Sequence, residues 1–398
     1  MKNSLFKLSS SLFIGLLLFS CTANEETIPS QPTDPDLASS VENNYVILFK
    51  ESPASNLRMV TPSYIERQLL MKNDANAFAS ELHLPNERIN RIYGGVLNGF
   101  SMKIYDQNVL AKIKEDPRVL KVIKDEIITL KKPGTGGGGT SPSQTTPWGI
   151  TRVGGAVTYI GSNVAYVMDT GIDLDHPDLN VDETLGFNSF TTGKDARSLD
   201  DGDGHGTHVA GTIAAIDNEI GVVGVAAGAT VVPVKVLNSR GSGSYSGIIA
   251  GIDFVGANGS NGDVANMSLG GGGYTPLDEA VEVAAATSGV KFILAAGNDA
   301  IDASQVSPAR ANGPNVFTIS ASDINDDFAY FSNYGAPVDW CAPGVNILST
   351  TPGGTYTSYN GTSMAAPHAA GVYLLGAAKA SGTVNNDPDG NPDPIISR

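Results

Sequence analysis

Ser363 is the residue of this 398-residue chain whose surroundings are best suited to chemistry. It lies in the segment Gly-Thr-Ser-Met-Ala-Ala-Pro-His at positions 361–368, and the apolar run that follows predicts a helix. Small neighbours leave the hydroxyl accessible, and a helix N-terminus stabilises negative charge that develops there. These features suit a nucleophile, although a lone serine before a helix is more often a simple N-cap.

A serine nucleophile needs a base within hydrogen-bonding distance, and the chain offers five histidines. Four of them are explained by a turn, by packing or by an unsuitable direction: His83, His176, His208 and His368. His205 remains, in a Gly-rich segment that opens a predicted helix of small residues. We therefore expect His205 to be the base that acts on Ser363.

The acid that orients such a base is best sought at the end of a buried strand. Residues 164–168 form a continuous apolar run, which predicts a strand covered on both faces, and Asp169 follows directly. In open α/β sheets, sites gather at the carboxyl ends of the strands. Taken alone, Asp169 could equally be a turn residue. Its position in the chain before His205 and Ser363 favours a role as the orienting acid.

Three segments carry a family resemblance, namely 167–173, 205–212 and 361–368. They resemble the signature blocks of the subtilisin-like serine proteases, the subtilase family, and they occur in that family's order of Asp, His and Ser. The resemblance implies that Ser363 attacks the scissile carbonyl, that His205 moves the proton and that Asp169 stabilises the charged imidazole.

A fourth segment would supply the oxyanion site. The apolar run 291–296 predicts another buried strand, and it is followed by Gly-Asn. The resemblance places the oxyanion donor of the family at Asn298, with the backbone N–H of Ser363 as the second donor. An ordinary turn would also explain a Gly-Asn pair.

Two further stretches are expected to hold substrate. The segment around Ser268 resembles the edge that pairs with substrate as an added strand. The opposite wall of the S1 pocket would be the segment before Asn298, and Val306 is expected at the pocket floor, which would favour apolar side chains of medium size. The expected substrate-binding residues are Ser268, Leu269, Gly270, Ala295, Ala296, Gly297 and Val306.

Several carboxylates near the expected site are spaced for a hard cation such as Ca²⁺: Asp173, Asp175, Asp178, Asp200, Asp201 and Asp203. Many subtilases bind calcium in nearby loops, so the resemblance implies a structural calcium ion. A solvated acidic loop would explain the same residues. The chemistry expected of the triad requires no cofactor.

The N-terminal residues 1–21 predict an export signal, with a basic start and a short apolar run that ends at Cys21. The residues before Cys21 resemble a bacterial lipoprotein box, so we expect lipidation of Cys21 and anchoring in a membrane that faces the periplasm or the cell surface. Phe19 departs from that box, and a plainly secreted protein is the alternative. With Cys21 lipidated, Cys341 would be an unpaired, buried thiol.

The composition after Cys21 predicts two modules joined by polar segments. Residues 22–43 read as a flexible tether. Residues 44–132 predict a small α+β, ferredoxin-like unit that resembles the inhibitory I9-type prodomain of the subtilases, although an unrelated module of that shape is possible. Residues 133–146 form a Gly/Ser/Pro-rich linker. The maturation cut is expected between Leu130 and Thr146.

Residues 147–380 alternate between strand-like and helical runs, which predicts a three-layer α/β/α fold with a mostly parallel sheet. Residues 381–398 read as a C-terminal tail. The segment 146–153 resembles the mature start seen near the proteinase K and aqualysin branch of the family.

The two predicted modules differ in their balance of charged residues. Residues 44–132 carry 14 Lys and Arg against 10 Asp and Glu, whereas residues 147–398 carry 9 against 26. A basic prodomain is attracted to an acidic protease domain, and an acidic domain repels nucleic acid. We expect a monomer whose partners are polypeptide substrates and its own prodomain.

The sequence therefore predicts an exported serine endopeptidase, made as a zymogen that processes itself. One alternative is a non-catalytic surface binding lipoprotein on a protease fold. The other is an esterase that uses the same three residues.

Overall fold

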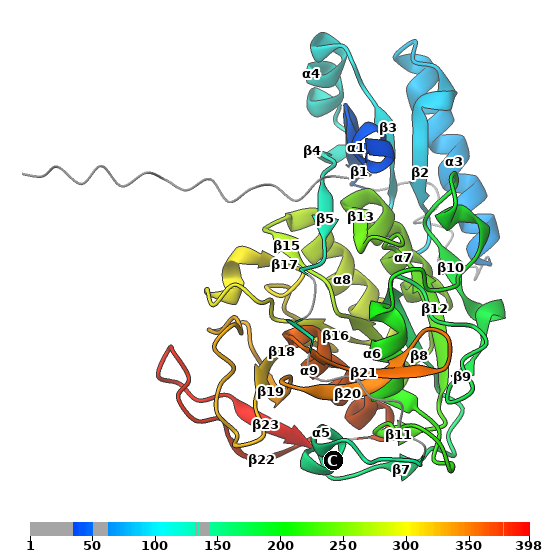
Figure 1. Ribbon diagram of the computed structural model, residues 1–398. Coiled ribbons are helices and arrows are strands. Elements are labelled where there is room, and N and C mark those ends of the chain that lie inside the picture. Colours follow the sequence, from blue (N-terminus) through cyan, green and yellow to red (C-terminus); the bar gives the residue numbers. More distant parts are fainter. Residues whose placement is uncertain (1–34, 51–62, 132–133, 136–142, 377) are drawn as a thin grey trace, which may run out of the picture. The chain divides into compact units, whose positions relative to one another are not determined.

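The computed structural model describes residues 35–50, 63–131, 134–135, 143–376 and 378–398 (Figure 1). By its internal contacts the chain divides into Met1–Thr33 and Asp34–Arg398. The first unit, with the predicted signal and Cys21, lies outside the described residues, so the description concerns the second. None of the described helices is long and apolar enough to cross a membrane.

The region predicted to be a prodomain contains a four-stranded antiparallel sheet in the order β2-β3-β1-β4. Its elements are β1 (Asn44–Phe49), α3 (Tyr64–Glu81), β2 (Ile89–Tyr93), β3 (Gly99–Lys103), α4 (Gln107–Glu115) and β4 (Val119–Lys124). A capping box begins α3, where the Ser63 and Glu66 side chains bond each other's backbone N–H. This arrangement confirms the predicted α+β unit.

Strand β1 shows how this sheet packs on both faces. Ile47 and Phe49 lie in the core formed with the prodomain helices, where Phe49 contacts Phe78 edge to face. Val46 and Leu48 point the other way and belong to a core shared with the predicted protease domain. Because successive side chains of a strand point to opposite faces, one strand serves both cores.

The domain predicted to be the protease is built on one large sheet in the order β10-β12-β8-β14-β16-β18-β19-β23-β22, with β9 beside β12. All neighbouring pairs are parallel except β22 with β23. The strands are β8 (Ala165–Asp169), β9 (Asn180–Val181), β10 (Phe187–Asn188), β12 (Thr230–Lys235), β14 (Val264–Met267), β16 (Lys291–Ala295), β18 (Val316–Ser322), β19 (Trp340–Pro343), β22 (Lys379–Thr383) and β23 (Pro394–Ser397).

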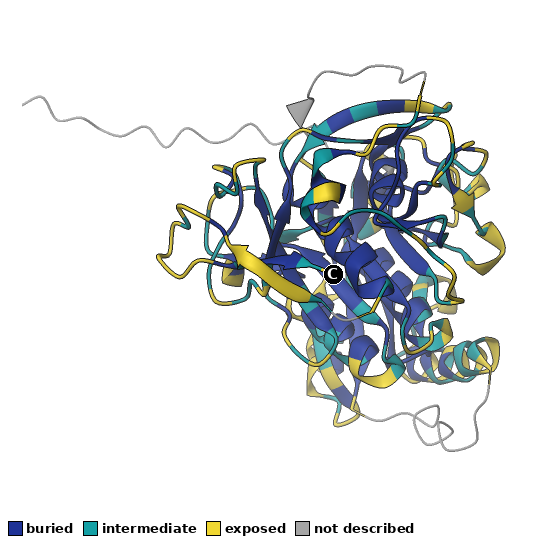
Figure 2. Cartoon of the chain, turned by 90° about the horizontal axis from the view of Figure 1, so that it is seen from below, coloured by how far each residue is buried: buried dark blue, intermediate teal, exposed yellow. Residues whose placement is uncertain are grey.

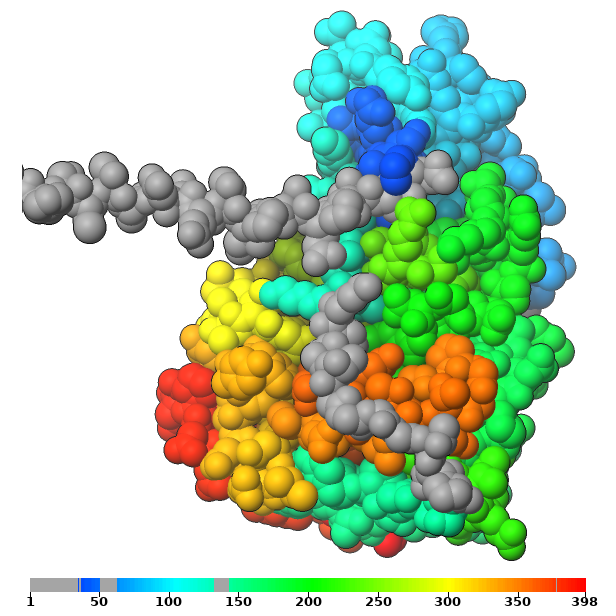
Figure 3. Space-filling view, viewed as in Figure 1, coloured from blue at the N-terminus to red at the C-terminus, as the bar shows by residue number. Residues whose placement is uncertain are grey.

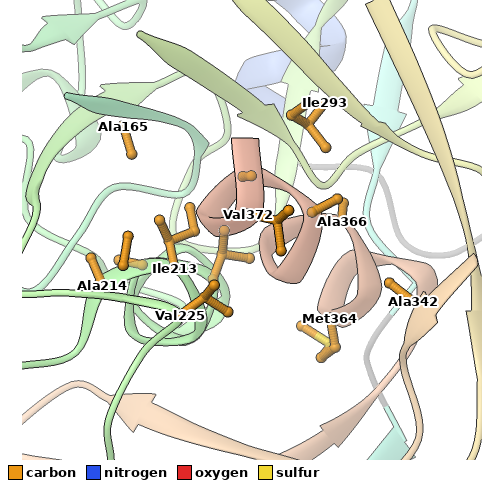
Figure 4. Close-up of a cluster of buried hydrophobic side chains, with 14 of the residues drawn as sticks. Ala165, Ile213, Ala214, Val225, Ile293, Ala342, Met364, Ala366 and Val372 are labelled. Carbon is orange, nitrogen blue, oxygen red and sulfur yellow. The ribbon is translucent and has the colours of Figure 1, made fainter. Parts of the chain in front are cut away.

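Helices cover both faces of this sheet. They are α5 (Trp148–Arg152), α6 (His205–Ala214), α7 (Tyr245–Asn258), α8 (Thr275–Ser288) and α9 (Thr362–Leu374). Val167 and Ile293 face the core of α6 and α9, whereas Met168 and Leu294 face the core of α7 and α8. Figure 4 shows side chains of α6 and α9 meeting in the first core. The three-layer α/β/α prediction is therefore confirmed.

Short strands complete the described structure: β5 (Ile127–Thr129), β6 (Gly134–Thr135), β7 (Val157–Thr158), β11 (Ala226–Ala227), β13 (Ser242–Ser244), β15 (Gly271–Gly272), β17 (Val306–Ser307), β20 (Ile347–Thr351) and β21 (Thr355–Asn360). Burial is concentrated in the central sheet and the helices beside it (Figure 2).

Two segments predicted to be irregular contain regular elements in their described residues. Residues 381–398 are not a loose tail, because β22 and β23 form a hairpin and β23 extends the main sheet beside β19. Ile395 and Ile396 are fully buried there, and their burial supplies the free energy that orders the segment. In the predicted tether, Pro35–Val41 forms helix α1, whose Leu37 is buried.

Candidate active site

Asp169 is the last residue of β8 and His205 is the first residue of α6. The Asp169 carboxylate is fully buried, and its two oxygens lie 2.8 and 2.9 Å from Nδ1 of His205. The backbone N–H of Thr170 donates to the same carboxylate at 2.8 Å. This contact gives Nδ1 the proton and leaves Nε2 as the basic nitrogen of a neutral ring.

The electrostatics of His205 result from opposing effects. Burial lowers the pKa of the imidazole, but the charge of Asp169 and its hydrogen bond outweigh burial, with further help from Asp203 and Asp201. The pKa of His205 is therefore raised above its ordinary value. A raised pKa makes the ring a stronger proton acceptor.

A second aspartate fixes the start of α6. The Asp201 side chain accepts hydrogen bonds from the Thr170 hydroxyl, from both the N–H and the hydroxyl of Thr207, and from the N–H groups of Asp203 and Gly204. The loop before α6 is thereby tied to the end of β8. Asp201 thus holds the two segments that carry Asp169 and His205.

These contacts do not favour the suggested calcium site. Both oxygens of Asp201 are occupied by protein donors, and the Asp173 side chain accepts from the N–H groups of Asp175 and Gly353. In the described part of the chain, no three His, Cys, Asp or Glu residues group as metal ligands would. The suggested aspartates therefore do not form a grouped set of calcium ligands in the described part of the chain, and no role is assigned to calcium.

Ser363 lies in the first turn of α9 and is nearly buried. Its hydroxyl donates to the carbonyl of Ser268 at 3.2 Å, and the Ser268 hydroxyl donates to the carbonyl of Ser363 at 2.8 Å. This pair of bonds joins the end of β14 to the start of α9. Among the described contacts of Ser363, none is a hydrogen bond to His205, so the hydroxyl must rotate before it can give its proton to that ring.

Asn298 is held in one orientation. Its Oδ1 accepts from the N–H and the hydroxyl of Thr362, at 2.8 and 2.9 Å. With Oδ1 occupied, the Nδ2 group is the end of the amide that can donate toward the cleft beside Ser363. This is the placement that an oxyanion donor requires.

Two of the other histidines, His208 and His368, are buried in the structure. Nε2 of His208 lies between the carbonyls of Ile347 and Thr357, and burial lowers the pKa of this ring to about 3. His368 bonds the Met364 carbonyl, and burial lowers its pKa to about 4. Both rings are therefore neutral at ordinary pH, as a packing role requires.

Cys341 is a free, buried cysteine, as predicted, and burial raises the pKa of its thiol to about 12. It lies in β19, outside the cleft.

A cleft of about 350 Å³ joins the predicted substrate residues to Ser363 and Asn298. Six of the seven line it: Ser268, Leu269, Gly270, Ala295, Gly297 and Val306. Ala296 does not, because its side chain is fully buried behind the wall and its carbonyl accepts from Asn333. Val306 lies between the two walls, since a Cβ on Gly270 or Gly297 would come within 3.4 or 3.7 Å of it.

The end of the prodomain lies in the same cleft, where Thr129, Leu130 and Lys131 line it. Strand β5 pairs antiparallel with β13, with Ile128 opposite Gly243, and the Leu130 N–H donates to the carbonyl of Gly241 at 2.8 Å. In Figure 3 this turquoise segment lies between green and yellow parts of the protease domain. The paired edge is therefore β13, and residues 268–270 line the cleft opposite.

Two buried carboxylates anchor the prodomain, and sequence reasoning missed both. Asp253, in α7, accepts from the backbone N–H groups of Gly95, Val96 and Leu97 at 2.7 to 2.9 Å. Asp125 of the prodomain accepts from the N–H and hydroxyl of Ser246, in the first turn of α7. An acidic residue inside the apolar run 245–258 was the one available signal for Asp253.

The sequence interpretation also missed β13 and Asp299. The Gly-Ser-Gly-Ser stretch at 241–244 has the composition of a loop, and Asp299 looks like part of the turn after Asn298. In the structure, β13 pairs with β5, and Asp299 forms an ion pair with Lys131. Neither contact could be foreseen from the local sequence.

A serine at a helix start and an oriented amide line one cleft, and together with a buried acid-imidazole pair such groups can perform acyl transfer. With a three-layer α/β/α fold, these features define the chain as a serine hydrolase.

Comparison with known proteins identifies the family. Residues 162–385 match the subtilase family, peptidase S8, and residues 44–131 match the peptidase inhibitor I9 family. The chain therefore belongs to the subtilase family, and it is a subtilisin-like serine endopeptidase with an I9-type prodomain.

Relatives agree with this assignment. Subtilisin NAT of Bacillus subtilis subsp. natto is 43% identical over 277 residues, which cover 68% of this chain and 68% of that protein. Subtilisin DY of Bacillus licheniformis is 47% identical over 242 residues, covering 58% of this chain and 85% of that protein. The suggested proximity to the proteinase K branch stays a prediction.

Among solved structures, that of a cold-adapted subtilisin-like serine proteinase matches with a TM-score of 0.50 and 40% identity. The match covers 57% of this chain and 83% of that chain.

The close approach of α6 to the loop after β8 gives a first prediction. A Cβ on Gly206 would lie 2.1 Å from the carbonyl oxygen of Gly171, so Gly206→Ala must push α6 away from Asp169. We expect a loss of about 1–3 kcal/mol of stability, typical of overpacking. Thermal unfolding in a Ser363→Ala background measures it, and Gly313→Ala, where the nearest atom is 4.0 Å away, is the control. Equal melting temperatures would contradict the argument.

Proposed function

We propose that this chain is an exported endopeptidase, made as a zymogen that cuts itself, in which Ser363 is the nucleophile, His205 the general base and Asp169 its orienting acid. The observation that carries the proposal is the position of the prodomain. Its last strand lies along β13, in the cleft that Ser363 and Asn298 line. A peptide already occupies the cleft in the way a substrate would.

The proposed reaction begins when the Ser363 hydroxyl turns from the Ser268 carbonyl toward Nε2 of His205. Oγ adds to the carbonyl carbon of the substrate while His205 takes the proton, and Asp169 stabilises the imidazolium. The Nδ2 group of Asn298 and the N–H of Ser363 then stabilise the oxyanion. The C–N bond breaks as His205 protonates the leaving amine, and water cleaves the acyl ester by the same route.

The backbone pairing in the cleft favours peptides over the two alternatives. An ester substrate would not need a strand edge such as β13, whereas a polypeptide gains main-chain hydrogen bonds along it. A binding protein would not need the buried pair of Asp169 and His205. Both alternatives are therefore weaker than the endopeptidase proposal.

Val306 supports a proposal about substrate size. Because it lies between Gly270 and Gly297, it shortens the pocket that receives the side chain before the cut. Large aromatic side chains should fit poorly there.

The location of the enzyme is also a proposal. Export, cleavage of residues 1–21 and lipidation of Cys21 rest on the N-terminal sequence, which lies outside the described residues. Plain secretion is the alternative, and a monomeric state is our expectation for either form.

The second prediction tests self-processing. The parent chain and Ser363→Ala are expressed without residues 1–21, and both are weighed intact. Only the parent should lose a fragment that ends between Leu130 and Thr146, and Asn298→Ala should slow that loss by about 10²–10³-fold. Ser260→Ala, at an exposed serine, is the matched control. If the Ser363→Ala chain is cut as well, another protease is responsible; if no chain is cut, self-processing is refuted.

The third prediction concerns pH. Protonated His205 cannot accept the Ser363 proton, so kcat/KM should fall as the pH drops through the pKa of His205, which Asp169 raises above its usual value near 6.5. Asp203 contributes to the raised pKa, so Asp203→Asn should shift the inflection toward acid.

The measurement is a pH profile of the processed enzyme on a peptide substrate that does not ionise. Asp217→Asn, at an exposed aspartate, should leave the inflection in place. An acid inflection below pH 6 in the parent would show that His205 is not the titrating base.

The fourth prediction concerns retention of the prodomain. Asp253→Asn replaces a carboxylate that accepts three backbone N–H bonds with an amide, one end of which must face a donor. A hydrogen bond to a charged group contributes about 1.5–3 kcal/mol, so the cut prodomain should dissociate at least tenfold more readily. Copurification of the cut prodomain with tagged protease domain measures this, again against Asp217→Asn. Unchanged retention would remove Asp253 from the interface.

A further inference from the structure

Two described pairings of the prodomain end and the linker lie on either side of a short interval, Lys131 to Gly134. Before it, β5 pairs with β13, and the Leu130 N–H makes the last described bond of that edge, to Gly241. After it, β6 pairs with β21, with Gly134 opposite Asn360, three residues before Ser363. Three peptide bonds join Lys131 to Gly134, a span of at most about 11 Å. These two pairings are the described contacts on either side of the interval, and Lys131 is its first residue.

Lys131 is the residue that directly follows the last backbone bond to the β13 edge. It also lines the cleft, together with Ser363, Asn298 and Val306. Its ammonium forms an ion pair with Asp299, the residue after the oxyanion donor. The pocket beside the reacting centre thus holds a lysine side chain, with a carboxylate at its rim.

Ile128 fixes the same register from the other end. Its side chain is buried in the core shared with the protease, within contact distance of a Cβ on Gly271. A shift of β5 by one residue would pull Ile128 out of this core and expose it. The buried Ile128 and the ion pair of Lys131 lie three residues apart along the chain. Together they hold this segment in a single register.

From these contacts we infer that the chain is cut at the peptide bond that follows Lys131, and that Asp299 gives the enzyme a preference for a basic side chain before the cut. This inference rests on the proposed self-processing. In the step, Ser363 Oγ bonds to the Lys131 carbonyl carbon, the C–N bond breaks and the next residue leaves as an amine. Water then releases the prodomain with a carboxylate at Lys131.

A lysine before the cut differs from the preference for medium apolar side chains that the sequence predicts. Val306 still limits the depth of the pocket, but a lysine can place its aliphatic part in the cleft while its ammonium stays at the rim. The two side chains are 59% and 43% exposed, so the ion pair is a modest one. We expect a two- to fivefold preference for lysine over methionine, which has nearly the same length and no charge.

The experiment has two arms. In the first, the chain lacking residues 1–21 is allowed to process, and the mass of the released fragment identifies its last residue. The expected fragment ends at Lys131. Lys131→Glu should slow the cut, and Asp299→Lys in the same chain should restore much of the lost rate, which a merely structural role for either residue would not produce. Lys72→Glu, at an exposed prodomain lysine, is the control.

In the second arm, the processed enzyme hydrolyses peptide anilides of the series Ile-Thr-Leu-X, with X as Lys, Met, Glu or Phe. The ratio of kcat/KM for Lys over Met should fall toward one in Asp299→Asn. It should also fall in 1 M salt, where charges are screened beyond about 3 Å. Asp217→Asn should keep the parent ratio.

The outcomes separate this inference from the function on which it rests. A fragment that ends elsewhere, from an active enzyme, overturns the cut site and leaves the endopeptidase proposal intact. A fragment ending at Lys131 with an unchanged Lys/Met ratio in Asp299→Asn overturns the role of Asp299. Absence of both processing and peptide hydrolysis overturns the proposed function and the inference together.

Discussion

The position of α6 over the end of β8 is the constraint on which the site depends. The hydrogen bond between Asp169 and His205 joins two residues that are 36 positions apart, and it exists only if the helix begins directly above the strand end. Gly206 permits the approach, because any side chain there would meet the Gly171 carbonyl. Asp201 then holds the connecting loop with bonds to Thr170 and Thr207. A buried carboxylate is costly unless it is bonded, so Asp169 and Asp201 both favour this one arrangement.

The sheet brings the remaining groups to the same edge. Because β14 and β16 are parallel neighbours, Ser268 and Asn298 follow them at one end of the sheet, where α9 begins. Bonds from Ser268 to Ser363 and from Thr362 to Asn298 then set the helix start against both strand ends. The Asn298 amide is oriented before any substrate carbonyl arrives, so no reorganisation is needed as the oxyanion forms.

This organisation explains what could be predicted from the sequence. Asp169, His205 and Ser363 lie at element ends that apolar runs and small residues mark, so local patterns suggested them, whereas Asn298 came from the family resemblance. Asp253 was missed because three of its partners are backbone N–H groups more than 150 positions away, and backbone groups leave no trace in composition. Ala296 was misplaced because a short segment that lines a pocket alternates between facing it and facing away. The C-terminal hairpin was missed because its turn is rich in Asp, Asn and Pro, which hides the short apolar pair that orders it.

The buried contacts of the prodomain also bear on how inhibition ends. Asp125 bonds the start of α7, and Asp253, inside the same helix, bonds the loop at Gly95 to Leu97. Both anchors, and the pairing of β5 with β13, lie on the N-terminal side of Lys131. A cut after Lys131 therefore breaks none of them, and the new carboxylate stays in the cleft beside Ser363. If the chain is cut as proposed, covalent release and relief of inhibition are separate events. The enzyme would then become free only when the prodomain dissociates or is degraded, and the exposed Lys131–Asp299 pair is too weak to prevent that alone.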